Sequence, residues 1–350
     1  MVEASPTPDA VLHALRSLRD PATGQDLVSQ NAIRELRIEG GAVRFFLALS
    51  QTGTPAAAAL KSDVERTLMQ LPGVAEVHAK LVNAPPAQGL PPKRPIPGVR
   101  RVVAVSSGKG GVGKSTVCVN LAAALARSGR SVGILDGDIY GPNVPMMLGA
   151  RGRPQGSADR IFPFVAHGMQ VMSMGLLVPE DQPMIWRGPR LNQAVQQFMF
   201  QVEWHDLDWL FVDLPPGTGD VQLTLTQNTE LTGAVIVTTP AEVAVLDVKK
   251  AIRMFERIGT PVLGVVENMA WFQPPGSAER YELFGSGGGR RIEAEFSVPL
   301  LGQIPIELAV RKGGDEGQPA VLADPDSAAA RAFVAAADEL VRRADATIGT

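Results

Sequence analysis

The feature that most constrains this chain is the run from Gly108 to Ser115. It reads Gly-Lys-Gly-Gly-Val-Gly-Lys-Ser and satisfies the pattern G-x-x-x-x-G-K-[ST]. A short apolar run, residues 102–105, precedes it, and a helical pattern over residues 116–129 follows it. Because strand, glycine-rich loop and helix stand in this order, the run predicts a phosphate-binding loop rather than a chance turn.

Each part of this loop has an expected role towards bound ATP. Glycines let the backbone wrap around phosphates, and the N-terminus of the following helix adds partial positive charge. Lys114 is expected to reach the β- and γ-phosphates, and the Ser115 hydroxyl is expected to ligate Mg²⁺. The other nucleotide contacts of this segment are assigned to Gly108, Lys109, Gly110, Gly111, Val112, Gly113 and Thr116.

Acidic residues follow two further apolar runs of the sequence. Asp213 ends the run Trp-Leu-Phe-Val-Asp and is expected to hold Mg²⁺ as its outer carboxylate, while Asp138 is expected to orient the attacking water. Ordinary turn aspartates are the alternative for both. Gly217, in Leu-Pro-Pro-Gly-Thr-Gly-Asp, is expected to present its N–H to the γ-phosphate and to report the loss of that group.

The rest of the large domain predicts an α/β fold with a doubly wound, mostly parallel sheet. Helix-length segments separate apolar runs rich in valine and isoleucine, which is typical of buried parallel strands. These runs lie at residues 102–105, 131–135, 210–212, 234–237 and 262–266.

A proline-rich segment divides the chain. Residues 83–98 hold six prolines, so they can form neither a helix nor a central strand. We therefore expect a small α+β domain at residues 1–82, a linker at 83–98 and a phosphate-loop domain at 99–350. The small domain shows a helix, a hairpin turning at Gly40 and Gly41, a second helix and a last strand.

Composition excludes several classes of protein. The chain of 350 residues carries 33 lysines and arginines against 36 aspartates and glutamates, so nucleic acid is not expected as a partner. No secretion signal and no transmembrane run is expected, which makes a cytoplasmic location the default. A single cysteine, Cys118, excludes a disulfide framework and a multi-cysteine metal cage within one chain. Its position among apolar residues predicts a buried side chain.

The additional lysine of the loop, Lys109, narrows the class of phosphate-loop protein. The segment GKGGVGKS resembles the deviant phosphate loop of the superfamily that includes partitioning ATPases, the arsenite pump and nitrogenase reductase. In that superfamily the early lysine crosses a dimer to the partner's phosphates. The resemblance therefore implies that Lys109 acts on the nucleotide of a partner subunit and that hydrolysis needs a homodimer, with Lys109, Lys114 and Asp138 as the catalytic residues.

Within that superfamily the chain resembles the Mrp/ApbC iron–sulfur cluster carriers over nearly all of residues 99–345. The matching stretches include LDGDIYGPNVPMMLG at 135–149, WRGPRLNQAVQQF at 186–198 and LLGQIPIE at 300–307. Residues 8–82 resemble the small domain often fused ahead of it. The resemblance implies contacts from Asn268 and the loop around Pro305 to the nucleotide base. It also implies a [4Fe–4S] cluster, with apoprotein clients and iron–sulfur assembly proteins as partners. The C-terminal helical pattern at residues 327–342 has few basic residues, so no membrane partner is expected.

One departure from the family bears directly on the cluster. The carriers of this family have a C-x-x-C pair. Two such pairs, one from each subunit, would bridge a [4Fe–4S] cluster across the dimer, since thiolates are the fitting ligands. Here the corresponding stretch, residues 271–285, contains no cysteine, so no cluster ligand is identifiable. Three hypotheses follow: an ATPase that carries or helps to deliver iron–sulfur clusters, a cluster-free adaptor switched by nucleotide, and a partitioning-type ATPase.

Overall fold

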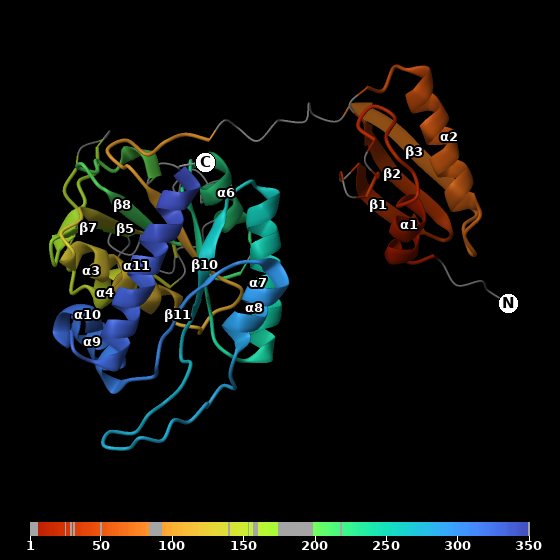
Figure 1. Ribbon diagram of the computed structural model, residues 1–350. Coiled ribbons are helices and arrows are strands. Elements are labelled where there is room, and N and C mark those ends of the chain that lie inside the picture. Colours follow the sequence, from red (N-terminus) through yellow and green to blue (C-terminus); the bar gives the residue numbers. More distant parts are fainter. Residues whose placement is uncertain are drawn as a thin grey trace. The chain divides into compact units, whose positions relative to one another are not determined.

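The computed structural model describes residues 6–24, 26–28, 30, 32–49, 51–83, 93–138, 141–152, 154–156, 160–173, 199–217 and 219–348. The chain divides into two compact units, Met1–Gly89 and Leu90–Thr350, each with its own sheet (Figure 1). The stretch at 186–198 and most of the proline-rich segment, residues 84–92, lie outside the described residues.

The small unit has the predicted order of helix, hairpin, helix and strand. Its elements are α1 (Pro8–Leu15), β1 (Ile33–Glu39), β2 (Ala42–Leu49), α2 (Pro55–Met69) and β3 (Glu76–Asn83). Threonines cap both helices, because the side chains of Thr7 and Thr54 accept hydrogen bonds from Ala10 N and Ala57 N, and a proline follows each cap. The sheet order is β1-β2-β3, with β1 antiparallel and β3 parallel to β2.

The large unit is built on an eight-stranded sheet of order β11-β10-β9-β4-β8-β5-β7-β6. All the strand pairs are parallel except β6 with β7. The strands are β4 (Val102–Ser107), β5 (Val132–Asp136), β6 (Phe164–Ala166), β7 (Met169–Ser173), β8 (Trp209–Asp213), β9 (Gly233–Thr238), β10 (Val262–Glu267) and β11 (Leu300–Gln303). The five predicted apolar runs form β4, β5, β8, β9 and β10.

Helices cover both faces of this sheet (Figure 1). One core contains residues of α3 (Lys114–Arg127), α4 (Val144–Met147), α10 (Ala320–Ala323) and α11 (Ala328–Ile348), beside α9 (Leu308–Glu316). The opposite core contains residues of α6 (Asp220–Asn228), α7 (Glu242–Arg257) and α8 (Gly288–Phe296). Along β4 the side chains alternate between the two cores, with Val103 and Val105 on one face and Val102 and Ala104 on the other. The doubly wound α/β fold is thus confirmed.

The end of the proline-rich segment packs onto the large unit. The Lys93 ammonium donates to the Ile258 carbonyl oxygen at 2.9 Å, and Ile96 is buried. Arg94 N donates to the Asn228 carbonyl oxygen at 3.0 Å. Residues 93–98 are therefore anchored beside α6 and α7.

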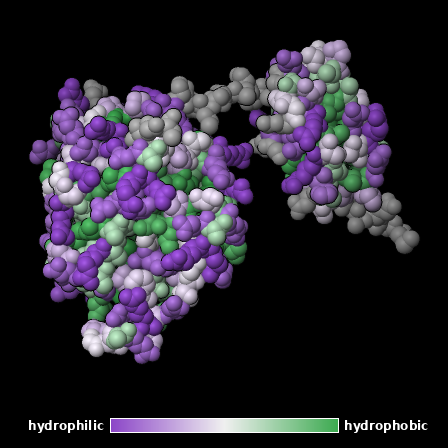
Figure 2. Space-filling view, in the orientation of Figure 1, coloured by the Kyte–Doolittle hydropathy of each residue, from purple (hydrophilic) through white to green (hydrophobic). Residues whose placement is uncertain are grey.

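No helix in the described part of the chain is long and apolar enough to cross a membrane. The face of the large unit seen in Figure 2 mixes hydrophilic and hydrophobic residues.

Candidate nucleotide site

The glycine-rich loop joins β4 to α3 at the carboxyl edge of the sheet. Gly111 and Gly113 have φ angles of 82° and 81°, a left-handed conformation that glycine adopts at little cost. Gly113 stands at the N-cap of α3 and offers no side-chain acceptor to the first amide groups of that helix. These amide groups are left for an anion, which is what the sequence pattern predicts.

Four predicted residues meet where the loop enters α3. The Lys114 ammonium lies 2.6 Å from Asp213 Oδ1, and the Ser115 hydroxyl donates to Asp213 Oδ2 at 2.6 Å. Asp138 Oδ2 lies 3.9 Å from the same ammonium. All four side chains are buried, although Lys114 and Asp213 lie 99 residues apart in sequence. The fold brings them together because β4, β5 and β8 are parallel neighbours that end at one edge.

Burial controls the electrostatics of this cluster. It raises the pKa of Asp213, against the opposing effect of the Lys114 charge and the hydrogen bonds from Lys114 and Ser115. Burial and the neighbouring charge of Asp213 raise the pKa of Asp136 from 3.8 to about 8. Burial, then the Asp213 charge, raises the pKa of the Cys118 thiol well above its usual value. Cys118 is completely buried, as predicted from its apolar neighbours.

Asp136 is a buried member of the site to which the sequence analysis assigned no role. Its carboxylate accepts hydrogen bonds from Asp138 N at 3.1 Å, Val144 N at 3.3 Å and the Ser173 hydroxyl at 3.1 Å. These bonds fix the backbone at Asp138 and again at Val144, six residues further along the chain. The available signal was its place at the end of an apolar run, two residues before Asp138.

Glu267 is a second residue that the sequence analysis did not single out. It is fully buried at the end of β10, where it accepts from Gly289 N and from the Gln303 side chain, both at 2.6 Å. It therefore joins β10 to the start of α8 and to β11. An acid directly before Asn268, at the end of a predicted strand, was the signal that could have identified it.

Asn268 and Pro305, for which the resemblance implies contacts to the nucleotide base, line one cavity. The Asn268 side-chain amide donates to the Val112 carbonyl oxygen at 2.9 Å, which ties the end of β10 to the phosphate loop. Both residues line a cavity of about 540 Å³ that also contacts Gly113 and Thr116. This cavity opens beside the loop and has Met146, Met147, Met269 and Phe284 among its apolar lining residues. An apolar cavity next to a phosphate loop fits a nucleotide base.

Gly217 and Lys109 are two further predicted residues with an expected role towards the phosphates. Gly217 N donates to the Ser107 carbonyl oxygen at 3.0 Å, so its N–H is bound to β4 in this structure. Lys109 is partly exposed, and within the described residues no carboxylate of the same chain lies within 4.0 Å of its ammonium. The remaining predicted loop residues, Gly108, Gly110, Gly111 and Val112, follow β4 directly.

The stretch where the family's cysteine pair is expected forms a loop whose two arms are joined by a pair of backbone hydrogen bonds. Phe272 and Tyr281 donate to each other's carbonyl oxygens at 2.8 Å, and the Arg280 guanidinium lies 4.7 Å from the Trp271 ring centroid. The loop projects from the large unit between β10 and α8 (Figure 1) and exposes Leu283 and Phe284. Among the described residues, no three histidine, cysteine, aspartate or glutamate side chains are arranged to hold a metal ion.

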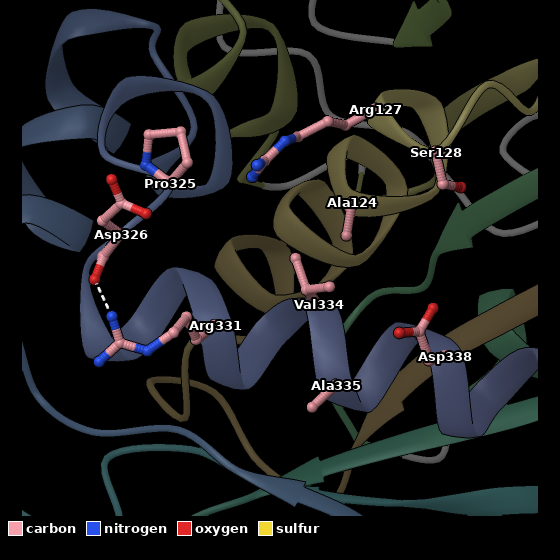
Figure 3. A pocket seen from close by; sticks show the side chains of 9 residues that line it. All are labelled: Ala124, Arg127, Ser128, Pro325, Asp326, Arg331, Val334, Ala335 and Asp338. Carbon is pink, nitrogen blue, oxygen red and sulfur yellow. Dashed lines mark hydrogen bonds between the residues drawn. The ribbon is translucent and has the colours of Figure 1, made fainter.

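A separate cavity of about 490 Å³ lies between the last turn of α3 and α11 (Figure 3). Arg127 and Arg331 line it together with Asp326 and Asp338, and Arg331 donates to the Asp326 carbonyl oxygen. The labelled side chains do not converge on one point in Figure 3. None of the predicted site residues lines this cavity.

The sheet and the phosphate loop define a P-loop NTPase. A solved nucleotide-binding protein from Archaeoglobus fulgidus in complex with ADP is 39% identical, with a TM-score of 0.57, over 64% of this chain and 88% of that one. The cell division ATPase MinD of Pyrococcus furiosus is 27% identical, with a TM-score of 0.53, over 69% of this chain and 99% of that one.

Residues 98–341 match the family described as NUBPL iron-transfer P-loop NTPases, and residues 8–79 match the family described as iron–sulfur cluster assembly proteins. An iron–sulfur cluster carrier protein of Synechocystis sp. is 49% identical over 343 residues, which are 95% of this chain and 97% of that protein. The chain belongs to the family of NUBPL-type iron-transfer P-loop NTPases.

Proposed function

We propose that this protein is a Mg²⁺-dependent ATPase that works as a homodimer in the transfer of iron–sulfur clusters to apoproteins. The observation that carries the proposal is the buried cluster of Lys114, Ser115, Asp213 and Asp138 at the phosphate loop, in a chain whose relatives are named as cluster carriers. The cytoplasm, where thiols are kept reduced, is the location that this function favours. In this proposal residues 83–98 link a partner-binding small domain to the ATPase domain.

The side chains of the site suit ATP hydrolysis. Lys114 supplies positive charge to the β- and γ-phosphates, and Asp138 orients the water that attacks the γ-phosphorus. The Ser115 hydroxyl and the Asp213 carboxylate are hard oxygen donors that fit Mg²⁺, which neutralises phosphate charge when it is bound. The Lys114 ammonium lies 2.6 Å from Asp213 Oδ1. Contact with bound phosphates therefore requires this lysine to move away from Asp213.

A partner subunit completes the site in this proposal. Lys109 is partly exposed and has no carboxylate partner within 4.0 Å in the described part of its own chain. It is therefore free to reach the phosphates of a second copy, as the resemblance implies. On ATP binding, the Gly217 N–H would leave the Ser107 carbonyl oxygen and donate to the γ-phosphate. Loss of the γ-phosphate on hydrolysis would return this N–H to β4.

The ATPase part of the proposal is tested by hydrolysis and dimerisation of three variants. Lys114→Ala and Asp138→Ala should each abolish turnover, and Lys109→Ala should abolish turnover and weaken ATP-dependent dimerisation. Tight ATP binding by the Lys109 variant should persist, because the lysine acts on the other subunit's nucleotide. Normal turnover by the Lys109→Ala variant would refute its role across the dimer.

The absence of the cysteine pair favours a second candidate function. Cys118 is the single thiol of the chain and lies completely buried, so two copies cannot supply the ligands of a bridging [4Fe–4S] cluster. A nucleotide-switched adaptor, which assists transfer without holding the cluster, is consistent with this composition. Anaerobic incubation with iron and sulfide separates the two: a coloured dimer supports a carrier, and a colourless one supports the adaptor.

A further inference from the structure

The small unit leaves one face of its sheet without a helix. Both of its described helices pack on the same side, since α1 contributes Val11 and Leu15 and α2 contributes Val64 and Leu68 to the core that contains Val43 of β2. Side chains alternate between the two faces of a strand. The neighbours of Val43 and Phe45 along β2 therefore project from the open face.

Strand register identifies the side chains on that face. Arg34 pairs with Phe46 and Arg37 pairs with Arg44 across β1 and β2, while Phe46 pairs with Lys80 across β2 and β3. Paired residues project from the same side of a sheet. Arg34, Arg37, Arg44 and Lys80 are all exposed, and they surround the half-buried Phe46. We name these five residues the basic sheet face.

The charge of this face is concentrated and not neutralised. Residues 6–83 contain eight lysines and arginines and eight aspartates and glutamates, so the unit as a whole is balanced. Within the described residues, however, no carboxylate lies within 4.0 Å of the four cations of the basic sheet face. Of the nearby acids, Glu35 lies in the bulge of β1 between Arg34 and Arg37. Glu39 and Glu76 pair with Ala42 on the rung next to Arg37 and Arg44, and Glu76 is bound to His78 at 2.6 Å.

The pairing of Arg37 with Arg44 is unfavourable for the sheet itself. Like charges directly opposite each other destabilise a strand pair. Neither guanidinium has an ion-pair partner among the described residues that would offset this cost. The arrangement therefore has an explanation if a negatively charged partner covers both groups.

We propose that the basic sheet face is a docking surface for an acidic segment of a partner protein. Charge complementarity identifies the chemistry of the partner. The Lys80 ammonium lies 5.9 Å from the centroid of the Phe46 ring, so a cation already covers the one aromatic ring of the face. Stacking of a nucleic-acid base on Phe46 is thereby disfavoured. Because Phe46 is half-buried, the one aromatic side chain of the basic sheet face offers little apolar area to a lipid bilayer.

The surface is separate from the ATP site and shares no residue with it. If the proposed function holds, the partner is a client or an assembly protein that the small unit recruits. The docking surface does not depend on ATP hydrolysis, so its failure and the failure of the ATPase assignment are distinguishable.

The experiment measures binding of a fluorescently labelled glutamate-rich peptide to the full-length protein by anisotropy. Wild-type protein should bind it, with an affinity that falls as salt rises. The double variant Arg37→Glu/Arg44→Glu should bind about tenfold more weakly or worse. The control Lys61→Glu/Arg66→Glu changes the same number of charges on α2, where both residues form ion pairs with α2 acids, and should stay within about twofold of wild type. Equal losses in both variants would overturn the proposal.

Competing ligands distinguish a protein partner from a nucleic acid and from a lipid surface. A single-stranded oligonucleotide of equal charge and vesicles containing anionic lipid are titrated against the bound peptide. Tighter binding of either competitor, lost in the Arg37→Glu/Arg44→Glu variant, contradicts a protein partner. Displacement by unlabelled peptide, and only weak displacement by the other two, supports it.

A single substitution separates docking from folding. Arg37→Glu replaces a like-charged cross-strand pair by an opposite one, so the small unit should become more stable to heat while it binds the peptide more weakly. A variant that is more stable and still binds as tightly as wild type would show that the arginine pair has no role in docking.

Discussion

Lys114 is the residue around which the candidate nucleotide site is organised. Its ammonium lies 2.6 Å from one oxygen of Asp213, whose other oxygen accepts from Ser115. The phosphate-loop motif, a contiguous run of eight residues, predicted that Lys114 and Ser115 belong to this site. The sequence analysis placed Asp213 at the same sheet edge because it ends an apolar run, but the direct contact with Lys114 emerges only from the register of β4 with β8.

Replacement of Asp213 by alanine should destabilise the nucleotide-free protein. The substitution leaves the Lys114 ammonium, which is almost fully buried, without its closest counter-charge. Breaking a buried ion pair on one side costs about 3–5 kcal/mol. Urea unfolding of the large unit measures this free energy, and the double variant Lys114→Met/Asp213→Leu should recover part of it. A stability equal to wild type for Asp213→Ala would contradict the pairing.

The buried carboxyl of Asp136 gives the site a pH dependence. The folded protein holds this proton up to about pH 8, whereas the unfolded chain loses it near its ordinary pKa of 3.8. The free energy of unfolding should therefore fall as pH rises through this interval. The asparagine variant, Asp136→Asn, should show a shallower fall. Denaturant titrations between about pH 5 and pH 8, without nucleotide and with a chelator, test this, and parallel profiles for the two proteins would refute it.

At the scale of elements, the predicted strands are those with continuous runs of branched side chains. The missed strands, β6, β7 and β11, have three, five and four residues, and β7 reads Met-Gln-Val-Met-Ser. Such short runs carry little periodicity, so their pairing with neighbours decides their structure. The same limit explains why the role of Glu267 was missed, since both of its partners are more than 20 residues away. Asp136 bonds to Asp138, Val144 and the distant Ser173, and no sequence motif indicates these contacts.

The junction of β10 with the phosphate loop should not tolerate a side chain at Gly113. A Cβ atom there would meet the Asn268 side-chain nitrogen at 2.3 Å, and the φ angle of 81° disfavours any residue with a Cβ. Gly113→Ala should cost about 1–3 kcal/mol of stability and weaken nucleotide binding, because Asn268 is displaced. Thermal unfolding and ATP titration check both effects. Gly141→Ala, outside the predicted nucleotide contacts, is the matched control, since its Cβ would meet nothing within 4 Å.

At the scale of the whole molecule, the single cysteine limits the cluster chemistry. Cys118 is buried behind the phosphate loop and its thiol pKa is raised, so little nucleophilic thiolate is present. The family was recognisable from motifs spread along the chain. The sequence also showed the missing cysteine pair, but the structure was needed to show that Cys118 cannot take its place.

Cluster transfer by this protein should not depend on Cys118. The Cys118→Ala variant should transfer clusters as wild type does, and native protein should resist alkylation by iodoacetamide until it is unfolded. Loss of transfer in this variant, with ATP hydrolysis intact, would show that the thiol becomes exposed and binds the cluster.

We propose that ATP turnover at Lys114 drives iron–sulfur transfer. The most direct test of this proposal is the anaerobic activation of an apo-enzyme that requires a [4Fe–4S] cluster, with iron, sulfide and this protein, in the presence and absence of Mg-ATP. We predict faster activation with Mg-ATP by wild-type protein and no such acceleration by Lys114→Ala. Activation by wild-type protein that is no faster than by the Lys114→Ala variant would contradict the claim.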